Sequence, residues 1–257
     1  MRLFKQAFMQ YSRFLKDSFL LALCLIAVAV AVIAVQINAV AEVIAQGGMT
    51  FSFADFFLLC NRGFTIFFAI CFMALLLFSF IINSDFRVNH IIRHNKTSEL
   101  LKKHLIIAGT TAFLFALLRS ATLAVYGFWH GFVQPVDFQT KGSVFVNTTN
   151  HPALEDYSIW FLVFWDFLFC LLNCLFFVFL FVLLKWLISK NLFVFLVILV
   201  LGFLDSTQYG LSYYCGISYE NLVKFNWLTI VPWVVLCAVL VLASFACANK
   251  KELLNAK

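Results

Sequence analysis

Long apolar runs, separated by short polar segments, dominate the pattern of hydrophobic and polar positions in this chain. A membrane-spanning α-helix needs about 20 predominantly apolar residues. We therefore expect an all-α integral membrane protein in which six helices cross the bilayer. The expected spans are residues 19–44, 56–82, 105–127, 159–187, 192–204 and 227–248.

The segment before the first span, residues 1–17, has a different pattern. Its apolar residues recur at spacings of three and four, with basic residues between them. Such a pattern predicts an amphipathic helix that lies in the membrane interface. The apolar members of this pattern are Leu3, Phe4, Phe8, Tyr11, Phe14 and Leu15.

The fifth run, residues 192–204, is short for a span and is followed by Asp205-Ser206-Thr207-Gln208. Two arrangements are open. Either the polar stretch continues the helix inside the bundle, or the helix breaks there and residues 205–226 form a re-entrant element buried by protein.

The basic residues alternate along the chain with the apolar runs. Fourteen of the 18 Lys and Arg residues fall in residues 2–16, in residues 84–104, around Lys185 and Lys190, and in residues 250–257. Excess positive charge in short loops marks the cytoplasmic side. The pattern predicts that both termini are cytoplasmic and that residues 127–157 and 206–226 are extracellular.

Composition supports a single membrane domain over residues 1–257. Hydrophobic residues make up 64% of the chain and charged residues 12%, whereas soluble domains are about half apolar and about a quarter charged. Six spans leave too little chain for a separate soluble core. The net charge of +6 favours contact with anionic membrane lipids, and we expect no nucleic-acid partner.

The eight cysteines do not indicate a disulfide framework. Most lie in apolar runs, where Cys acts as a small hydrophobe. Cys60 and Cys215 approach the outer face, but spacing alone does not establish whether they pair. Cys170 and Cys174 stand four apart on one helical face, and we expect packing there and no metal site.

Four charged residues interrupt the apolar runs: Arg62, Arg119, Asp166 and Asp205. At about 1.5 Å per residue, Arg119 and Asp166 each lie roughly 12 Å from the outer ends of consecutive spans. Their equal depth predicts an ion pair, with Arg62 and Asp205 completing a neutral cluster. Such a cluster either lines a translocation path or clamps the outer bundle. Asn173, Gln36 and Asn38 are expected to form hydrogen bonds between helices.

The basic loop at residues 84–104 mixes charged residues with apolar ones, which suits docking on another protein. Its candidate docking residues are Phe86, Arg87, His90, Ile91, Arg93, Lys96 and Thr97. All five histidines of the chain fall in loops or at the edges of the expected spans. His90 and His94 stand four apart, as metal ligands can, but without a third ligand we expect these two to be surface residues.

This layout resembles the type-2 family of ABC exporter permeases, in which an interfacial helix precedes six spans. The segment Ile91-Ile92-Arg93-His94-Asn95-Lys96-Thr97, followed by Leu100-Leu101-Lys102-Lys103, is similar to a short motif of Gram-positive permeases of this family. The resemblance implies that residues 84–104 form a coupling loop on an ATPase subunit. It also implies that residues 205–227 match a re-entrant region.

The chain has no Gly-x-x-x-x-Gly-Lys-Ser/Thr phosphate loop, so we expect no ATPase activity and no cofactor of its own. ATP and Mg²⁺ would sit on a dimer of separate ATPase subunits. A second copy of this chain, or a homologous permease, would complete the transporter. The resemblance further implies a bacterial cell membrane and export of antimicrobial or other amphipathic peptides. The alternative is a non-transporting immunity, assembly or sensor subunit that binds a partner through the same loop.

Overall fold

Every regular element that the structure describes is helical, as the apolar runs predict. The computed structural model describes residues 2–47, 52, 55, 57–58, 66–83, 97–129, 138–139, 143–153, 157–188, 190–207, 219–223 and 226–255. The elements in chain order are α1 (Arg2–Asp17), α2 (Phe19–Gly47), the π-helix η1 (Ile66–Cys71), α5 (Phe72–Ile82), α7 (Thr97–Trp129), α8 (Val144–Thr149), α9 (Ile159–Leu187), α10 (Asn191–Asp205), α12 (Tyr219–Val223), the 3₁₀-helix η3 (Trp227–Ile230) and α13 (Val231–Asn255).

Within the described residues, four helical segments are long and apolar enough to cross a membrane. These are Phe19–Ala39, Thr97–Gly127, Ile159–Leu187 and Trp227–Lys250. Two further apolar segments, Ile66–Ile82 and Asn191–Asp205, are shorter. The chain is thus an all-α membrane protein, and four of the six expected spans reach full length within the residues that the structure describes.

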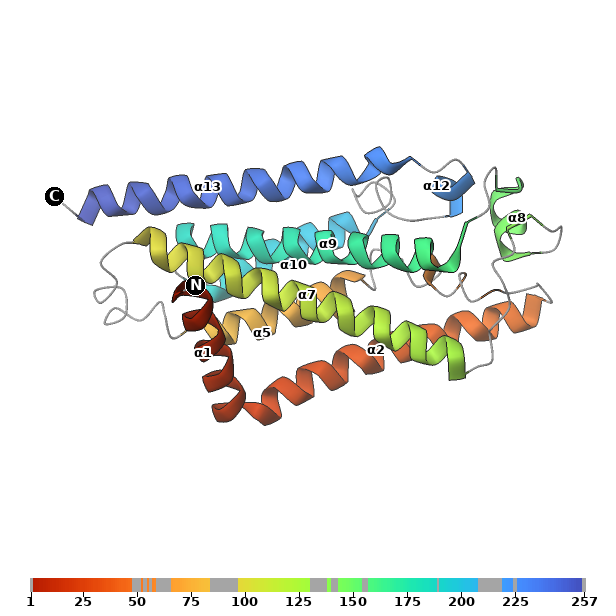
Figure 1. Cartoon of the computed structure of the whole chain (residues 1–257), viewed down its shortest axis with the longest axis horizontal. Helices are drawn as coiled ribbons and strands as arrows, with labels where there is room; N and C mark the ends of the chain where they lie inside the picture. Colours follow the sequence, from red (N-terminus) through yellow and green to blue (C-terminus); the bar gives the residue numbers. More distant parts are fainter. Residues whose placement is uncertain are drawn as a thin grey trace.

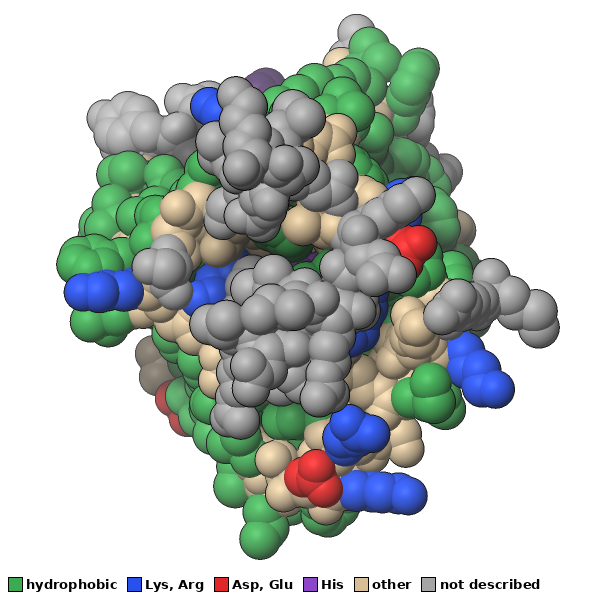
Figure 2. All heavy atoms as spheres, turned by 90° about the vertical axis from the view of Figure 1, so that its left-hand side faces the viewer, with side chains coloured by type: hydrophobic (Ala, Val, Ile, Leu, Met, Phe, Trp, Pro, Cys, Tyr) green, Lys and Arg blue, Asp and Glu red, His purple; other side chains and the backbone are tan. Residues whose placement is uncertain are grey.

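The long helices run back and forth along one axis, whereas α1 lies across it, and both termini lie at the same end of the bundle (Figure 1). We call this end, where α7 begins and α5, α9 and α13 finish, the basic end. Figure 2 looks onto it and shows Lys and Arg side chains around its rim. The exposed cations on the helices that meet there are Lys5, Arg13, Lys16, Lys102, Lys190 and Lys250.

Helix α9 lies between α7 and α13 and packs against both (Figure 1). On α7, Ala108, Ala112 and Ala116 are fully buried at four-residue spacing. Small residues in such a row let membrane helices approach closely, and close packing is what stabilises helix pairs in lipid, where the hydrophobic effect between helices is absent.

The π-helix η1 packs into a notch on the short helix α10. A Cβ atom built on Gly202 would lie 2.0 Å from Cζ of Phe67, so glycine is required for this approach. The Phe67 ring also contacts Phe177 of α9, with ring centroids 4.8 Å apart. Gly202 and Phe67 therefore join the two shorter apolar segments.

Several predicted boundaries are corrected by the structure. The prediction of a loop through His104 is wrong for residues 97–104, which form the first turns of α7. The segment 127–157 contains the end of α7 and the short helix α8, and 206–226 contains α12. Helix α10 ends at Asp205, so the polar stretch does not continue it as a helix; residues 208–218 lie outside the described part.

Helices α8 and α12 lie side by side at the end opposite the basic end (Figure 1). The Tyr157 hydroxyl donates a hydrogen bond of 2.9 Å to the Leu222 carbonyl. This bond ties the start of α9 to the segment that returns to the last span.

Candidate functional site

Arg119 of α7 and Asp166 of α9 form an ion pair between Nη1 and Oδ2. Each residue is 1% exposed. The pair is the one that equal depth in consecutive antiparallel spans predicts. It joins the two helices that border the centre of the bundle.

The pair is held in surroundings where an isolated charge is very costly. Removing either charge from water costs several kcal/mol, which only a close counter-charge offsets. Arg119 offers a planar fork of donors, whereas the second oxygen of Asp166, Oδ1, accepts no hydrogen bond from the described part of the chain. The site is thus a neutral pair with one buried acceptor position unfilled by the described residues.

The carboxylate lies on a buried face of α9 that also carries one amide and two thiols. Asp166, Cys170, Asn173 and Cys174 are all buried and follow at spacings of four, three and one, which puts them on one face of the helix. Cys71 of η1 donates a hydrogen bond of 3.2 Å to Oδ1 of Asn173. The expected inter-helix role of Asn173 is therefore confirmed.

The other two amides expected to bond between helices do not do so within the described residues. Gln36 keeps a buried Oε1 without a hydrogen-bond partner there, and Asn38 is exposed. Of the predicted four-residue charge cluster, Asp205 is partly buried at the last position of α10. Arg62 lies outside the described residues.

The predicted docking residues Phe86, Arg87, His90, Ile91, Arg93 and Lys96 also lie outside the described part of the chain. The remaining member, Thr97, is the first residue of α7. Its hydroxyl donates a hydrogen bond of 3.2 Å to the Ala248 carbonyl. The start of α7 is thus tied to the last helix at the basic end.

A group that the sequence reasoning missed lies just inside the basic end. His104 is fully buried, and its ring lies 6.3 Å from that of Trp186 between centroids. Lys103 and Lys185 beside them are also largely buried. The sequence interpretation placed His104 in a loop or at a span edge. The helical spacing of His104 to Leu100, Leu101 and Ala108, which are all buried, was the signal that could have revealed its burial.

Helix α1 is fastened to the bundle by two polar side chains, Gln10 and Tyr11. The Tyr11 hydroxyl bonds to the Thr111 hydroxyl and lies 3.4 Å from the Ile107 carbonyl. Gln10 donates a bond of 2.7 Å to the Ile81 carbonyl, one of the carbonyls that the end of α5 leaves without a helical partner. Burial raises the pKa of the Tyr11 phenol well above its ordinary value, and the bond to Thr111 offsets part of that rise.

Helix α1 has one side that faces the bundle, one exposed apolar side and one exposed basic side. Ala7 is buried against the bundle, on the side that carries Gln10 and Tyr11. Phe4 and Phe8 are 66% and 75% exposed on a neighbouring apolar side, while Lys5, Arg13 and Lys16 are exposed on the far side. The prediction of an amphipathic helix is confirmed, and part of its face packs on protein.

Among the residues that the structure describes, no three His, Cys, Asp or Glu side chains are grouped so that they could hold a metal ion. No protein-family profile, curated protein sequence or solved structure matches this chain.

Proposed function

We propose that this chain is the membrane-spanning subunit of an ATP-driven exporter in a bacterial cell membrane. Six segments would cross the bilayer, with the basic end and both termini in the cytoplasm. A dimer of ATPase subunits would supply ATP, Mg²⁺ and hydrolysis, and a second permease copy or homologue would complete the path for a peptide or other amphipathic substrate.

The observation that carries this proposal is the position of α1 relative to the basic loop. The loop joins Asn83, which follows α5, to Thr97, which begins α7. Gln10 of α1 bonds to the end of α5, and Tyr11 bonds to α7. A force on the loop would therefore act on both helices together with the interfacial helix.

The same helix α7 leads from the loop to the buried ion pair. Arg119 is 22 residues after Thr97 in one uninterrupted helix, so a shift or rotation of α7 moves its guanidinium relative to Asp166. Separating a pair in a low-dielectric interior costs Coulomb energy and leaves two buried charges unpaired, so the pair would resist small shifts of α7. The proposal requires a second arrangement of α7 and α9 in which this contact is broken.

The test is purification of the full chain from its native membrane, followed by identification of bound proteins and measurement of ATP turnover. The proposal predicts an ATPase subunit in stoichiometric amount and ATP hydrolysis that the chain stimulates. A purified chain that carries another partner on the loop and no ATPase would favour the non-transporting immunity, assembly or sensor subunit, in which the ion pair acts as a fixed clamp.

A further inference from the structure

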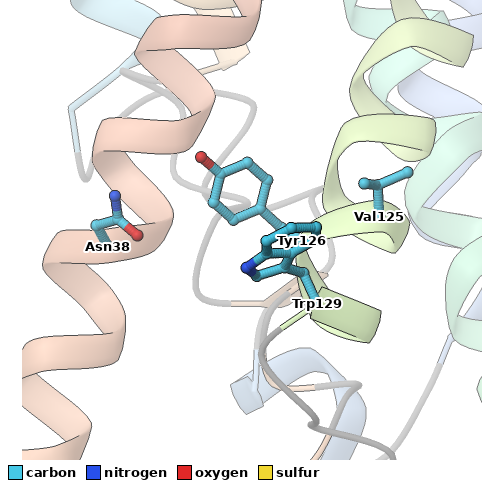
Figure 3. A pocket seen from close by; sticks show the side chains of 4 residues that line it. All are labelled: Asn38, Val125, Tyr126 and Trp129. Carbon is cyan, nitrogen blue, oxygen red and sulfur yellow. The ribbon is translucent and has the colours of Figure 1, made fainter.

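A pocket of about 360 Å³ opens between α2 and α7, close to the end of the bundle opposite the basic end. Its lining residues are Asn38 of α2 and Val125, Tyr126 and Trp129 of α7. Figure 3 shows the Tyr126 ring in the space between the helices, with Asn38 facing it from α2. Among the described residues, the pocket is thus lined by α2 on one side and α7 on the other.

The α7 side of the pocket lies at the level where the span expected at residues 105–127 would leave the hydrocarbon. Val125 and Tyr126 directly precede Gly127, the last residue of that expected span, and Asn38 lies in the apolar run expected to cross at residues 19–44. Tyr and Trp are enriched at this depth because their rings are apolar and their tips are polar. A ligand here would have one part among the headgroups and another among acyl chains.

The lining offers hydrogen-bond donors and carries no charge among its described members. The Asn38 amide and the Trp129 indole form no hydrogen bond within the described part of the chain, and Trp129 is 85% exposed. One turn deeper, exposed Val35 and Ala121 present apolar surface. The Asn38 and Trp129 donors next to the apolar surface of Val35 and Ala121 suit a ligand of matching structure. Such a ligand has uncharged hydrogen-bond acceptors where its acyl chain begins.

We propose that this pocket binds one glycerophospholipid of the adjacent leaflet. Its ester carbonyls accept hydrogen bonds from Asn38 and Trp129, and one acyl chain lies along Val125 and Val35. A pocket of this volume lies within the range of small-molecule sites. Recognition through the esters does not depend on headgroup charge, and the site is independent of whether the chain is an exporter.

The test uses the full chain purified in a mild detergent and counts retained phospholipids by native mass spectrometry. Asn38→Leu and Trp129→Ala each remove one donor, and each should lower the apparent affinity for a titrated phosphatidylglycerol or phosphatidylethanolamine by about threefold to tenfold. Trp160→Ala is the matched control, since Trp160 is 79% exposed at the start of α9 and does not line the pocket. It should bind as the unchanged chain does.

A second measurement covers the case in which a variant loses its fold. A phospholipid with a photoreactive group near the top of its acyl chain should label the unchanged chain at residues 125–129 or near Asn38. Labelling spread evenly over the exposed apolar surface, equal affinity in all three variants, or a pocket that an amphipathic peptide fills while phospholipid does not would each overturn the proposal.

Discussion

Arg119 of α7 and Asp166 of α9 form a buried ion pair on the seam between two full-length spans. Replacing Arg119 by Leu leaves the carboxylate buried and unpaired, which should lower the free energy of unfolding by about 3–5 kcal/mol. Asp166→Leu should have a similar effect. Thermal unfolding of the chain in detergent, followed by circular dichroism, measures both.

Exchanging the two residues of the pair distinguishes the contribution of the ion pair from that of side-chain packing. Arg119→Asp alone should be at least as harmful as Arg119→Leu, because two carboxylates then share a buried site. Adding Asp166→Arg to the same chain should restore much of the lost stability. If the double variant is no more stable than either single one, the two side chains do not act as a pair.

Phe67 and Gly202 give a packing prediction. A methyl group at position 202 would overlap the Phe67 ring, and such overpacking costs about 1–3 kcal/mol. Gly202→Ala should therefore destabilise the chain, and Phe67→Leu in addition should relieve part of the loss.

Gly109 is the matched control within α7, since nothing lies within 4 Å of a Cβ atom built there. Gly109→Ala should be neutral or stabilise the helix by about 0.5–1 kcal/mol. If Gly202→Ala and Gly109→Ala lower the free energy of unfolding equally in the same assay, the close packing of Phe67 on Gly202 is contradicted.

Tyr11 gives a pH prediction. Because burial raises the pKa of its phenol, the folded chain keeps the proton at a pH where the unfolded chain releases it. The resulting stability is fully present below the ordinary tyrosine pKa of about 10 and is lost as pH rises from there toward the raised value.

Tyr11→Phe should remove this part of the alkaline loss. At neutral pH it should also cost about 1 kcal/mol, because the bond to Thr111 is gone. Unfolding midpoints measured from pH 8 to pH 11 test the point. A slope that is identical in Tyr11→Phe and in the unchanged chain would show that Tyr11 does not cause it.

The orientation of the bundle can be measured with a membrane-impermeant maleimide. Asn147 on α8 and Lys190 before α10 are both exposed and lie at opposite ends (Figure 1). A cysteine replacing Asn147 should react in intact cells, and one replacing Lys190 only after permeabilisation. The reverse pattern would show that the basic end faces outward.

The local sequence pattern was sufficient to predict features that depend on a single helix, such as its limits. The limits of α9 match the apolar run at residues 159–187, because Ser158 caps its first turn and the apolar run ends at its last. The Arg119–Asp166 pair followed from depth in adjacent spans, which chain order fixes. The prediction of a loop at residues 102–104 was wrong because it relied on the charges of Lys102 and Lys103, which lie in helix α7.

Contacts between segments far apart in the sequence could not be read in the same way. Tyr11 looked like one more apolar residue of an interfacial helix, and nothing local shows that its hydroxyl meets Thr111. The notch at Gly202 depends on the π-helix η1. The composition of an apolar run does not distinguish a π-helix from an α-helix, so η1 could not be predicted. These contacts arise from how whole helices pack.

The most direct test of the exporter account is ATP turnover by the ATPase subunits that the proposal predicts, reconstituted with this chain in liposomes. Arg87→Glu combined with Arg93→Glu in the basic loop should reduce turnover to the rate of the isolated ATPase. Lys190→Glu, an exposed cation at the same end but outside the loop, should leave turnover unchanged. Turnover that is indifferent to the loop substitutions, or a chain that binds no ATPase, would contradict the account.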